Sequence, residues 1–241
     1  MAISELDLPT GVIAHSSADA QRQAELMADS VAKALRYAVQ THGVASLVVS
    51  GGRSPVAFFE SLSRRELDWA KIQISLADER WVPVSHPDSN EGLLRRHLLQ
   101  GPAAAARLVG LYQSAASLEQ AAERADAVLA ELPPIDVLVL GMGEDGHTAS
   151  LFPGYPAVEE TRRWVVGVPK DNVEPFVPRV SLTLPALASC REMLFEVAGE
   201  NKRAILTRLF AGENLPANRA RSLGETVWLI DQAALPENFP G

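Results

Sequence analysis

Helical and strand-like segments alternate along this chain, and the alternation restricts its fold more than any other feature. Between residues 23 and 40, apolar residues recur at spacings of three and four, which predicts a long helix with one buried stripe that ends at Gly43. The apolar run Ala45–Val49 predicts a strand directly after it. Such a chain favours a largely parallel sheet flanked by helices on both faces, so we predict a doubly wound, Rossmann-like α/β fold.

The same patterns continue over the rest of the sequence. They predict strands at residues 72–77, 135–140, 164–168, 179–182, 193–197 and 226–230. They predict helices after Pro55, at 88–99 behind an Asp or Ser cap, at 115–132 and at 201–210. The stretch 153–178 holds five prolines and is the expected irregular loop region. Because no stretch is long enough to be a linker, we expect residues 1–241 to form a single domain.

Charge and cysteine content limit the partners of the chain. The formal net charge is −8, and such a surface repels nucleic acid and anionic membranes. A phosphorylated ligand would therefore need a local site made of helix N-termini and a few Arg or Lys side chains. The single cysteine, Cys190, fits a reducing compartment, and we see neither a membrane span nor a secretory signal. We expect a cytoplasmic protein without nucleic-acid or membrane partners; its oligomeric state stays open.

The most informative motif follows the predicted strand 135–140. Three glycines within six residues let the backbone turn sharply and approach a ligand closely, and the turn carries Asp145 and His147. An imidazole can take up and return a proton near neutral pH. The simpler interpretation is a tight strand-to-helix turn with a surface histidine.

The whole run 141–154 resembles the signature of the 6-phosphogluconolactonases, which belong to a wider family that includes the glucosamine-6-phosphate deaminases. The resemblance implies the NagB-type α/β fold of that family. It also implies a hydrolase that needs no cofactor and opens 6-phospho-D-glucono-1,5-lactone to 6-phospho-D-gluconate in the oxidative branch of the pentose phosphate pathway.

A second segment, residues 50–55, resembles the family loop that cradles the substrate. Glycines after a strand, followed by a proline at a probable helix start, suit an anion site even without the resemblance. An ordinary strand–helix turn is the alternative. Gly51, Gly52 and Ser54 carry over as substrate-binding residues, whereas Arg53 departs from the family pattern and its role stays open.

A third segment, Asp78–Arg80 with Ser89 and Asn90 further on, is similar to another family motif. Its charges follow a predicted strand, at the sheet edge where open α/β folds bind ligands. We expect Asp78 to accept hydrogen bonds from sugar hydroxyls and Arg80 to contact the phosphate or the polarised carbonyl. Strand alternation would direct Glu79 away from the ligand. A charged loop with an internal ion pair is the simpler alternative.

Two basic residues complete the resemblance. Arg179 heads a predicted strand and Lys202 follows a glycine at the start of a predicted helix, which matches family elements that hold the phosphate. Standing alone, both would be ordinary surface cations. The neighbouring Arg203 has no such match.

The predicted mechanism is direct attack of water on the lactone carbonyl. His147 acts as general base, Asp145 orients or stabilises the imidazole, and glycine-turn amides such as that of Gly143 receive the developing negative charge. The sequence lacks a serine nucleophile elbow, and its five histidines show no metal-ligand spacing, so we expect no metal. Two alternatives remain: a glucosamine-6-phosphate deaminase that uses Asp78 as the carbon-proton base, and a non-catalytic sugar-phosphate sensor.

Overall fold

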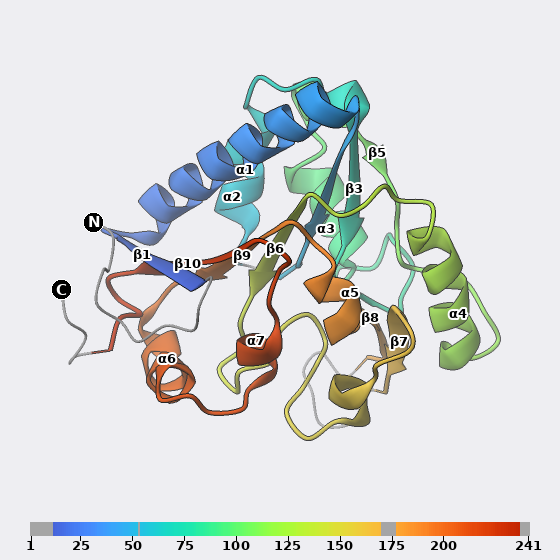
Figure 1. Ribbon diagram of the computed structural model, residues 1–241. Coiled ribbons are helices and arrows are strands. Elements are labelled where there is room, and N and C mark those ends of the chain that lie inside the picture. Colours follow the sequence, from blue (N-terminus) through green and yellow to red (C-terminus); the bar gives the residue numbers. More distant parts are fainter. Residues whose placement is uncertain (1–11, 53, 170–176, 237–241) are drawn as a thin grey trace.

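Seven strands form the centre of the structure, a computed structural model that describes residues 12–52, 54–169 and 177–236 (Figure 1). They lie in the order β1-β10-β9-β6-β2-β3-β5. The strands are Val12–Ser17 (β1), Ala45–Val49 (β2), Ile72–Leu76 (β3), Arg107–Leu108 (β5), Val137–Gly141 (β6), Glu192–Val197 (β9) and Glu225–Asp231 (β10). Each pairing between these neighbours is parallel, which confirms the predicted α/β fold class.

The strand order reverses direction between β2 and β6. After β2 the chain moves outward on one side through β3 and β5, and β6 then returns to the other side of β2, followed by β9 and β10. At such a reversal the connections leave to opposite sides, so a crevice opens beyond the carboxyl ends of the two central strands. The fold therefore predicts where a ligand site lies before any side chain is considered.

Helices cover both faces of the sheet. In Figure 1, α1 and α2 lie on one side of it and α6 and α7 on the other. The helices are Ala20–His42 (α1), Val56–Ser63 (α2), Asn90–His97 (α3), Leu118–Leu129 (α4), Leu184–Ala188 (α5), Arg203–Phe210 (α6) and Pro216–Arg219 (α7). Helix α1 ends as predicted at Gly43, whose φ of 78° is a left-handed conformation that costs glycine little. Ser89 provides the predicted cap of α3, because its hydroxyl accepts a hydrogen bond from the N–H of Gly92.

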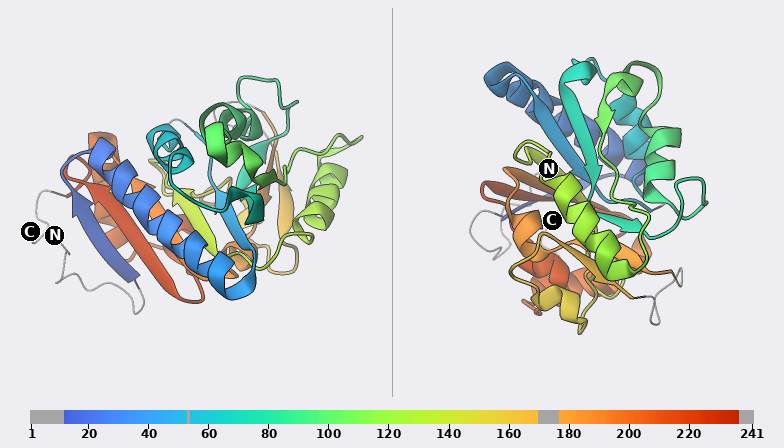
Figure 2. Two further views of the ribbon diagram at one scale, coloured as in Figure 1. Left: turned by 90° about the horizontal axis from the view of Figure 1, so that it is seen from above. Right: turned by 90° about the vertical axis from the view of Figure 1, so that its right-hand side faces the viewer.

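A second, antiparallel sheet has the order β4-β8-β7 and consists of Asp78–Arg80 (β4), Arg179–Leu182 (β8) and Val165–Val168 (β7). Two of these strands were predicted, but their place in a separate sheet was not. Helix α4 packs against this small sheet, and Figure 2 shows α4 at the opposite end of the molecule from β1. The stretch 153–178 is thus more regular than expected, since it contains β7 and the short 3₁₀ helix Pro156–Glu159; residues 170–176 lie outside the described part.

The edge strand β1 is the longest element that the sequence patterns did not reveal; the short elements β5, α5 and α7 were not predicted either. Its residues include His15, Ser16 and Ser17, so the apolar run is short, and the strand pairs only with β10. Inside the sheet, by contrast, every residue of β2 is buried. Phe195 and Trp228, paired on neighbouring strands, stack with ring centroids 4.0 Å apart. Among the described residues, no helix is both long and apolar enough to cross a membrane.

Candidate active site

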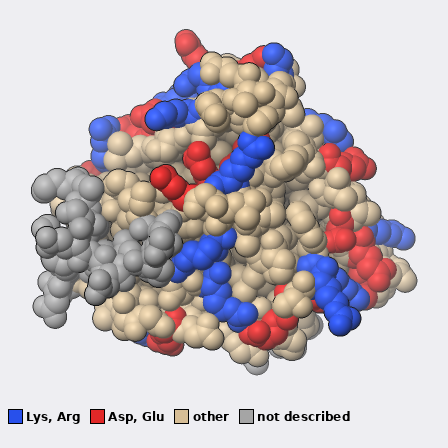
Figure 3. Space-filling model, viewed as in Figure 1, with Lys and Arg blue, Asp and Glu red and all other residues tan. Residues whose placement is uncertain are grey.

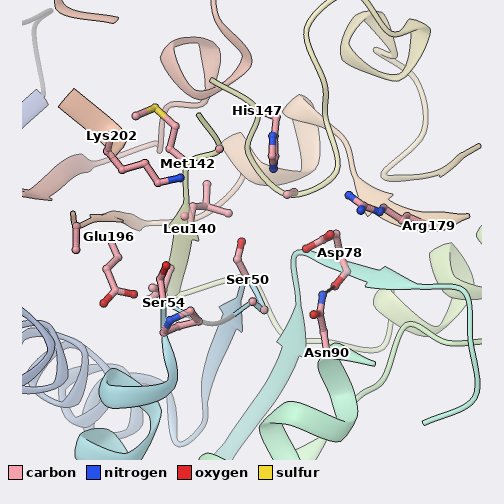
Figure 4. A pocket seen from close by; sticks show the side chains of 18 of the residues that line it. Ser50, Ser54, Asp78, Asn90, Leu140, Met142, His147, Arg179, Glu196 and Lys202 are labelled. Carbon is pink, nitrogen blue, oxygen red and sulfur yellow. Dashed lines mark hydrogen bonds between the residues drawn. The ribbon is translucent and has the colours of Figure 1, made fainter. Parts of the chain in front are cut away.

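A pocket of about 250 Å³ opens beyond the carboxyl ends of β2 and β6, at the reversal of strand order. Its wall includes all predicted site residues except Asp145, namely Gly51, Gly52, Ser54, Asp78, Arg80, Gly143, His147, Arg179 and Lys202. These residues come from positions more than a hundred apart in the sequence, and the fold brings them to one place. Figure 4 shows His147 between Lys202 on one side and Arg179 on the other.

His147 and Asp145 form a directly bonded pair. The imidazole Nδ1 lies 2.5 Å from Oδ1 of Asp145, and the same carboxylate oxygen accepts the backbone N–H of His147 at 3.1 Å. Burial on its own would raise the pKa of Asp145, but the hydrogen bond to His147 and the nearby charge lower it. A carboxylate that accepts the Nδ1 proton leaves Nε2 with a free electron pair, which is the form that acts as a base.

Gly143 permits the imidazole to lie where it does. A Cβ at this position would come within 2.1 Å of both Cε1 and Nδ1 of His147, and such an overlap would displace the ring. The N–H of Gly143 donates to the carbonyl of His147, and the N–H of Gly146 donates to the carbonyl of Gly143. Both amides are used within the turn, so the expected stabilisation of negative charge by glycine-turn amides does not extend to these two. Gly143 lines the pocket, and its lack of a side chain leaves the space that the imidazole occupies.

Arg80 and Arg179 lie directly opposite each other on the antiparallel strands β4 and β8. Like charges at paired positions repel. Burial lowers the pKa of Arg179; the Asp78 carboxylate acts against this effect, and the Arg80 charge adds to it. Nη1 of Arg80 donates to the carbonyl of Asp88, while its Nε is buried without a hydrogen-bond partner among the described residues. An anion between the two guanidinium groups would relieve their repulsion, which favours a phosphate or carboxylate ligand.

Asp78 is buried beside these cations. The hydroxyl of Ser150 donates to Oδ2 of Asp78 at 2.6 Å, and the side-chain amide of Asn90 donates to its backbone carbonyl at 2.9 Å. Ser150 thus holds the carboxylate, and Asn90 holds the backbone of the same residue. Its position against the pocket leaves the other carboxylate oxygen as an acceptor for a ligand hydroxyl.

Glu79 does not line the pocket, in agreement with the alternation predicted for its strand. Its buried carboxylate instead accepts the backbone N–H groups of Arg80, Asn90 and Glu91 and the hydroxyl of Ser89. Burial raises the pKa of Glu79 to about 7, although these four hydrogen bonds act in the opposite direction. The carboxylate ties β4 to the first turn of α3 and so fixes the two segments of the third motif relative to each other.

Asn90 connects this network to the glycine loop. A Cβ on Gly51 would lie 2.0 Å from Oδ1 of Asn90, so the loop and the amide fit only because Gly51 has no side chain. Ser50, at the start of the same loop, has a buried hydroxyl without a hydrogen-bond partner in the described part of the chain. Figure 4 shows this hydroxyl near the middle of the pocket. A ligand oxygen is a suitable partner for it.

Lys202 completes the set of cations. Burial lowers its pKa, and the acidic groups of Glu144 and Asp145 act against that effect. The neighbouring Arg203, which sequence analysis left out of the site, lies outside the pocket wall and bonds to Glu200 and the carbonyl of Ala233. Arg53 is not among the described residues.

Sequence analysis missed Glu196, which lines the pocket from the end of β9. The signal was a single carboxylate within the apolar strand 193–197. Ser50 and Asn90 also line the pocket; both lie in motifs described above but were not predicted as site residues. Across the described residues, no group of three or more His, Cys, Asp or Glu side chains is arranged to hold a metal ion.

The charges around the site are local. On the face that Figure 3 shows, Lys and Arg side chains are interspersed with Asp and Glu and do not form one broad basic area. The fold and the pocket together define an α/β protein with three cationic side chains and an imidazole in one pocket at its strand-order reversal.

Comparison with known proteins specifies this class further. Residues 18–228 match the family of glucosamine-6-phosphate isomerases/6-phosphogluconolactonase. A 6-phosphogluconolactonase of Pseudomonas aeruginosa is 55% identical over 223 residues, which cover 89% of this chain and 92% of that protein. One of Pseudomonas putida is 53% identical, with 89% and 90% covered. The crystal structure of a 6-phosphogluconolactonase from Shewanella baltica has a TM-score of 0.85 at 32% identity and covers 96% of this chain and 100% of that one. The chain belongs to this family, as its motifs predicted.

Proposed function

We propose that this protein hydrolyses 6-phospho-D-glucono-1,5-lactone to 6-phospho-D-gluconate, the lactonase step in the oxidative branch of the pentose phosphate pathway. Its enzyme class, a lactonase of the 6-phosphogluconolactonase type, is confirmed by relatives that are 55% and 53% identical over most of the chain. The observation that carries the reaction is the Asp145-bonded imidazole of His147 on the wall of a pocket that also holds three cations.

The proposed reaction begins with a water molecule beside Nε2 of His147. His147 takes a proton from the water as the oxygen attacks the lactone carbonyl, and it returns the proton to the ring oxygen as the ester bond breaks. Asp145 holds the Nδ1 side of the ring and stabilises the imidazolium that forms between these two steps. The reaction consumes one water molecule and leaves His147 in its starting state.

The proposed binding mode uses the remaining polar groups. Lys202 and Arg179 have long side chains that reach the pocket from different sides of His147, and we assign the phosphate to them together. Arg80 lies opposite Arg179 and is assigned to the phosphate or to the carbonyl oxygen, where negative charge develops during attack. Asp78 and the loop of Gly51, Gly52 and Ser54 contact the hydroxyl groups and the phosphate of the substrate.

The decisive experiment measures hydrolysis of freshly prepared 6-phosphogluconolactone above its spontaneous rate. We expect His147→Ala to lower kcat by about 10²–10⁴-fold, the usual effect of removing a general base, with an unchanged circular dichroism spectrum. His97→Ala is the matched control, because His97 lies on α3 and pairs with Glu60 outside the pocket.

Three results would contradict the proposal. Hydrolysis by His147→Ala at nearly the wild-type rate would exclude His147 as the base. Release of ammonia from glucosamine 6-phosphate by the wild-type protein, without lactone hydrolysis, would establish the deaminase alternative, and binding of the lactone without turnover would establish a sensor.

A further inference from the structure

The mechanism leaves one buried carboxyl group of the pocket unused. Glu196 lies at the end of β9, where it is only 7% exposed, and it lines the same pocket as His147 and Lys202. No hydrogen bond or ion pair joins its side chain to any other residue that the structure describes. Figure 4 shows it on the pocket wall on the same side as Lys202.

An unpartnered carboxyl in this position needs an explanation. In the sheet Glu196 lies between Gly141 of β6 and Leu229 of β10, and Leu194 precedes it on the same face of the strand. An apolar residue would suit such surroundings, because a buried polar group without a partner costs free energy. The carboxyl oxygens of Glu196 are not among the fully enclosed unpartnered atoms of the described residues, so they are open to the pocket, where a group of a bound ligand can pair with them.

We propose that Glu196 is a specificity-determining residue that exchanges hydrogen bonds with a hydroxyl group of the bound sugar phosphate. The identity of the ligand rests on the proposed function. A hydroxyl group donates and accepts at once, and a protonated carboxyl does the same, so the two are complementary. The proposed function assigns Lys202 and Arg179 to the phosphate. It assigns Asp78 to some of the sugar hydroxyl groups, and Glu196 is the carboxyl available to the hydroxyl groups that lie far from Asp78.

Burial keeps this carboxyl in the form that suits the role. It raises the pKa of Glu196 to about 8, so the group is neutral at neutral pH and does not offset the cations. On the packed side, the buried residues of α1 are apolar apart from the amide Gln23, and Glu60 of α2 is exposed. Lys33 of α1 lies with Glu192 in a separate surface groove. The charged or titratable groups on the remaining pocket wall are Asp78, Arg80, His147, Arg179 and Lys202.

Calorimetric binding of two probes, 6-phosphogluconate and inorganic phosphate, tests this role without turnover. At neutral pH we expect Glu196→Leu to weaken 6-phosphogluconate binding about tenfold, the effect of one hydrogen bond lost with its partner left unpaired, and to change phosphate binding less than about twofold. Glu196→Gln retains a donor and an acceptor and should bind both probes like the wild type. Glu192→Leu, at the exposed beginning of the same strand, is the matched control.

A pH series separates a ligand contact from a structural role. As the pH rises through about 8, ionisation of Glu196 in the wild type should weaken 6-phosphogluconate binding, and Glu196→Gln should lack this part of the decline. Loss of a proton from Lys202 affects both proteins alike, so the difference between them reports on Glu196 alone.

Three outcomes would overturn the proposal. The first is that Glu196→Leu weakens the binding of both probes equally, and the second is that wild type and Glu196→Gln have identical pH profiles of binding. The third is that Glu196→Leu has no effect on binding when Arg53→Gln is also present, which would indicate an ion pair within the protein. Lactone turnover by the wild type is measured in parallel. If turnover is absent while the binding pattern holds, the proposed function fails and the role of Glu196 stands.

Discussion

At the scale of single residues, the site depends on how the Asp145 carboxylate and the His147 imidazole meet. Two residues apart in the chain, they touch because the turn between β6 and the following segment folds back on itself, and the glycine at 143 leaves room for the ring. Sequence spacing alone did not establish this contact. In the proposed mechanism, this direct bond makes Asp145 a positioning residue that acts through the histidine.

Asp145→Asn tests that role. The amide no longer favours the imidazolium, so we expect kcat to fall about tenfold or more while KM changes little. Steady-state kinetics with the lactone measures both parameters. Glu144→Gln, the adjacent exposed acid that bonds to Asn201, should retain kcat within about twofold. A normal kcat for Asp145→Asn would remove Asp145 from the mechanism.

Lys202 and Arg203 form a second natural comparison, because they are adjacent but only Lys202 lines the pocket. We expect Lys202→Ala to raise KM about tenfold or more through loss of a charge-assisted hydrogen bond to the phosphate. Arg203→Ala should change KM less than about twofold. If the two substitutions raise KM equally, the assignment of the phosphate to Lys202 is wrong.

At the scale of secondary structure elements, the Glu79 carboxylate joins β4 to α3. It accepts hydrogen bonds from the backbone N–H of Arg80, from two N–H groups at the start of α3 and from one hydroxyl. Asn90, which it holds, in turn packs against the Gly51 loop. A residue outside the pocket wall thereby holds Arg80 and Asn90 in position. This network explains why the Asp78–Arg80 motif and the Ser89–Asn90 pair work as one unit: the Glu79 carboxylate bonds to both Ser89 and Asn90.

We expect Glu79→Gln to destabilise the protein by about 1–3 kcal/mol, because the introduced amide N–H₂ faces backbone N–H donors that lose their acceptor. Chemical denaturation measures this change. KM for the lactone should rise as well, since Arg80 and Asn90 lose their common anchor. Glu60→Gln, at an exposed position of α2, should leave stability within about 0.5 kcal/mol. Unchanged stability and KM in Glu79→Gln would contradict the anchoring role.

At the scale of the whole molecule, the fold keeps several carboxyl groups buried, and this affects its stability against pH. Burial raises the pKa values of Glu79 and Glu196 from 4.5 to about 7 and about 8. A carboxyl whose pKa is raised by folding stabilises the folded state while it is protonated. Its contribution is complete below pH 4.5 and is lost as the pH rises through the folded-state value.

The melting temperature should therefore decrease between about pH 5 and pH 8.5, by at least about 2–4 °C, which corresponds to about 1 kcal/mol in a chain of this size. Differential scanning calorimetry across this range measures the trend. Glu196→Gln should flatten it and melt above the wild type at the alkaline end. A wild-type melting temperature that rises over the same interval would contradict the protonated state of these buried groups.

The sequence by itself determined the longer helices and the central strands, because hydrophobic period, caps and glycine stops are local properties of the chain. Its motifs also determined the family, since each retains a short, ordered run of residues. The single domain and the cytoplasmic location stay predictions.

The tertiary structure alone decided which of these local features meet. It placed β7 and β8 in a separate antiparallel sheet with β4, so that Arg80 and Arg179 face each other. It placed β1 at the edge of the sheet, where the strand pairs with β10. It also engaged the N–H groups of Gly143 and Gly146 in hydrogen bonds within their own turn. It also buried Glu196 beside the ligand space. Strand pairing, hydrogen-bond use and burial depend on contacts between residues far apart in the chain, and a single sequence does not encode such contacts in any local pattern.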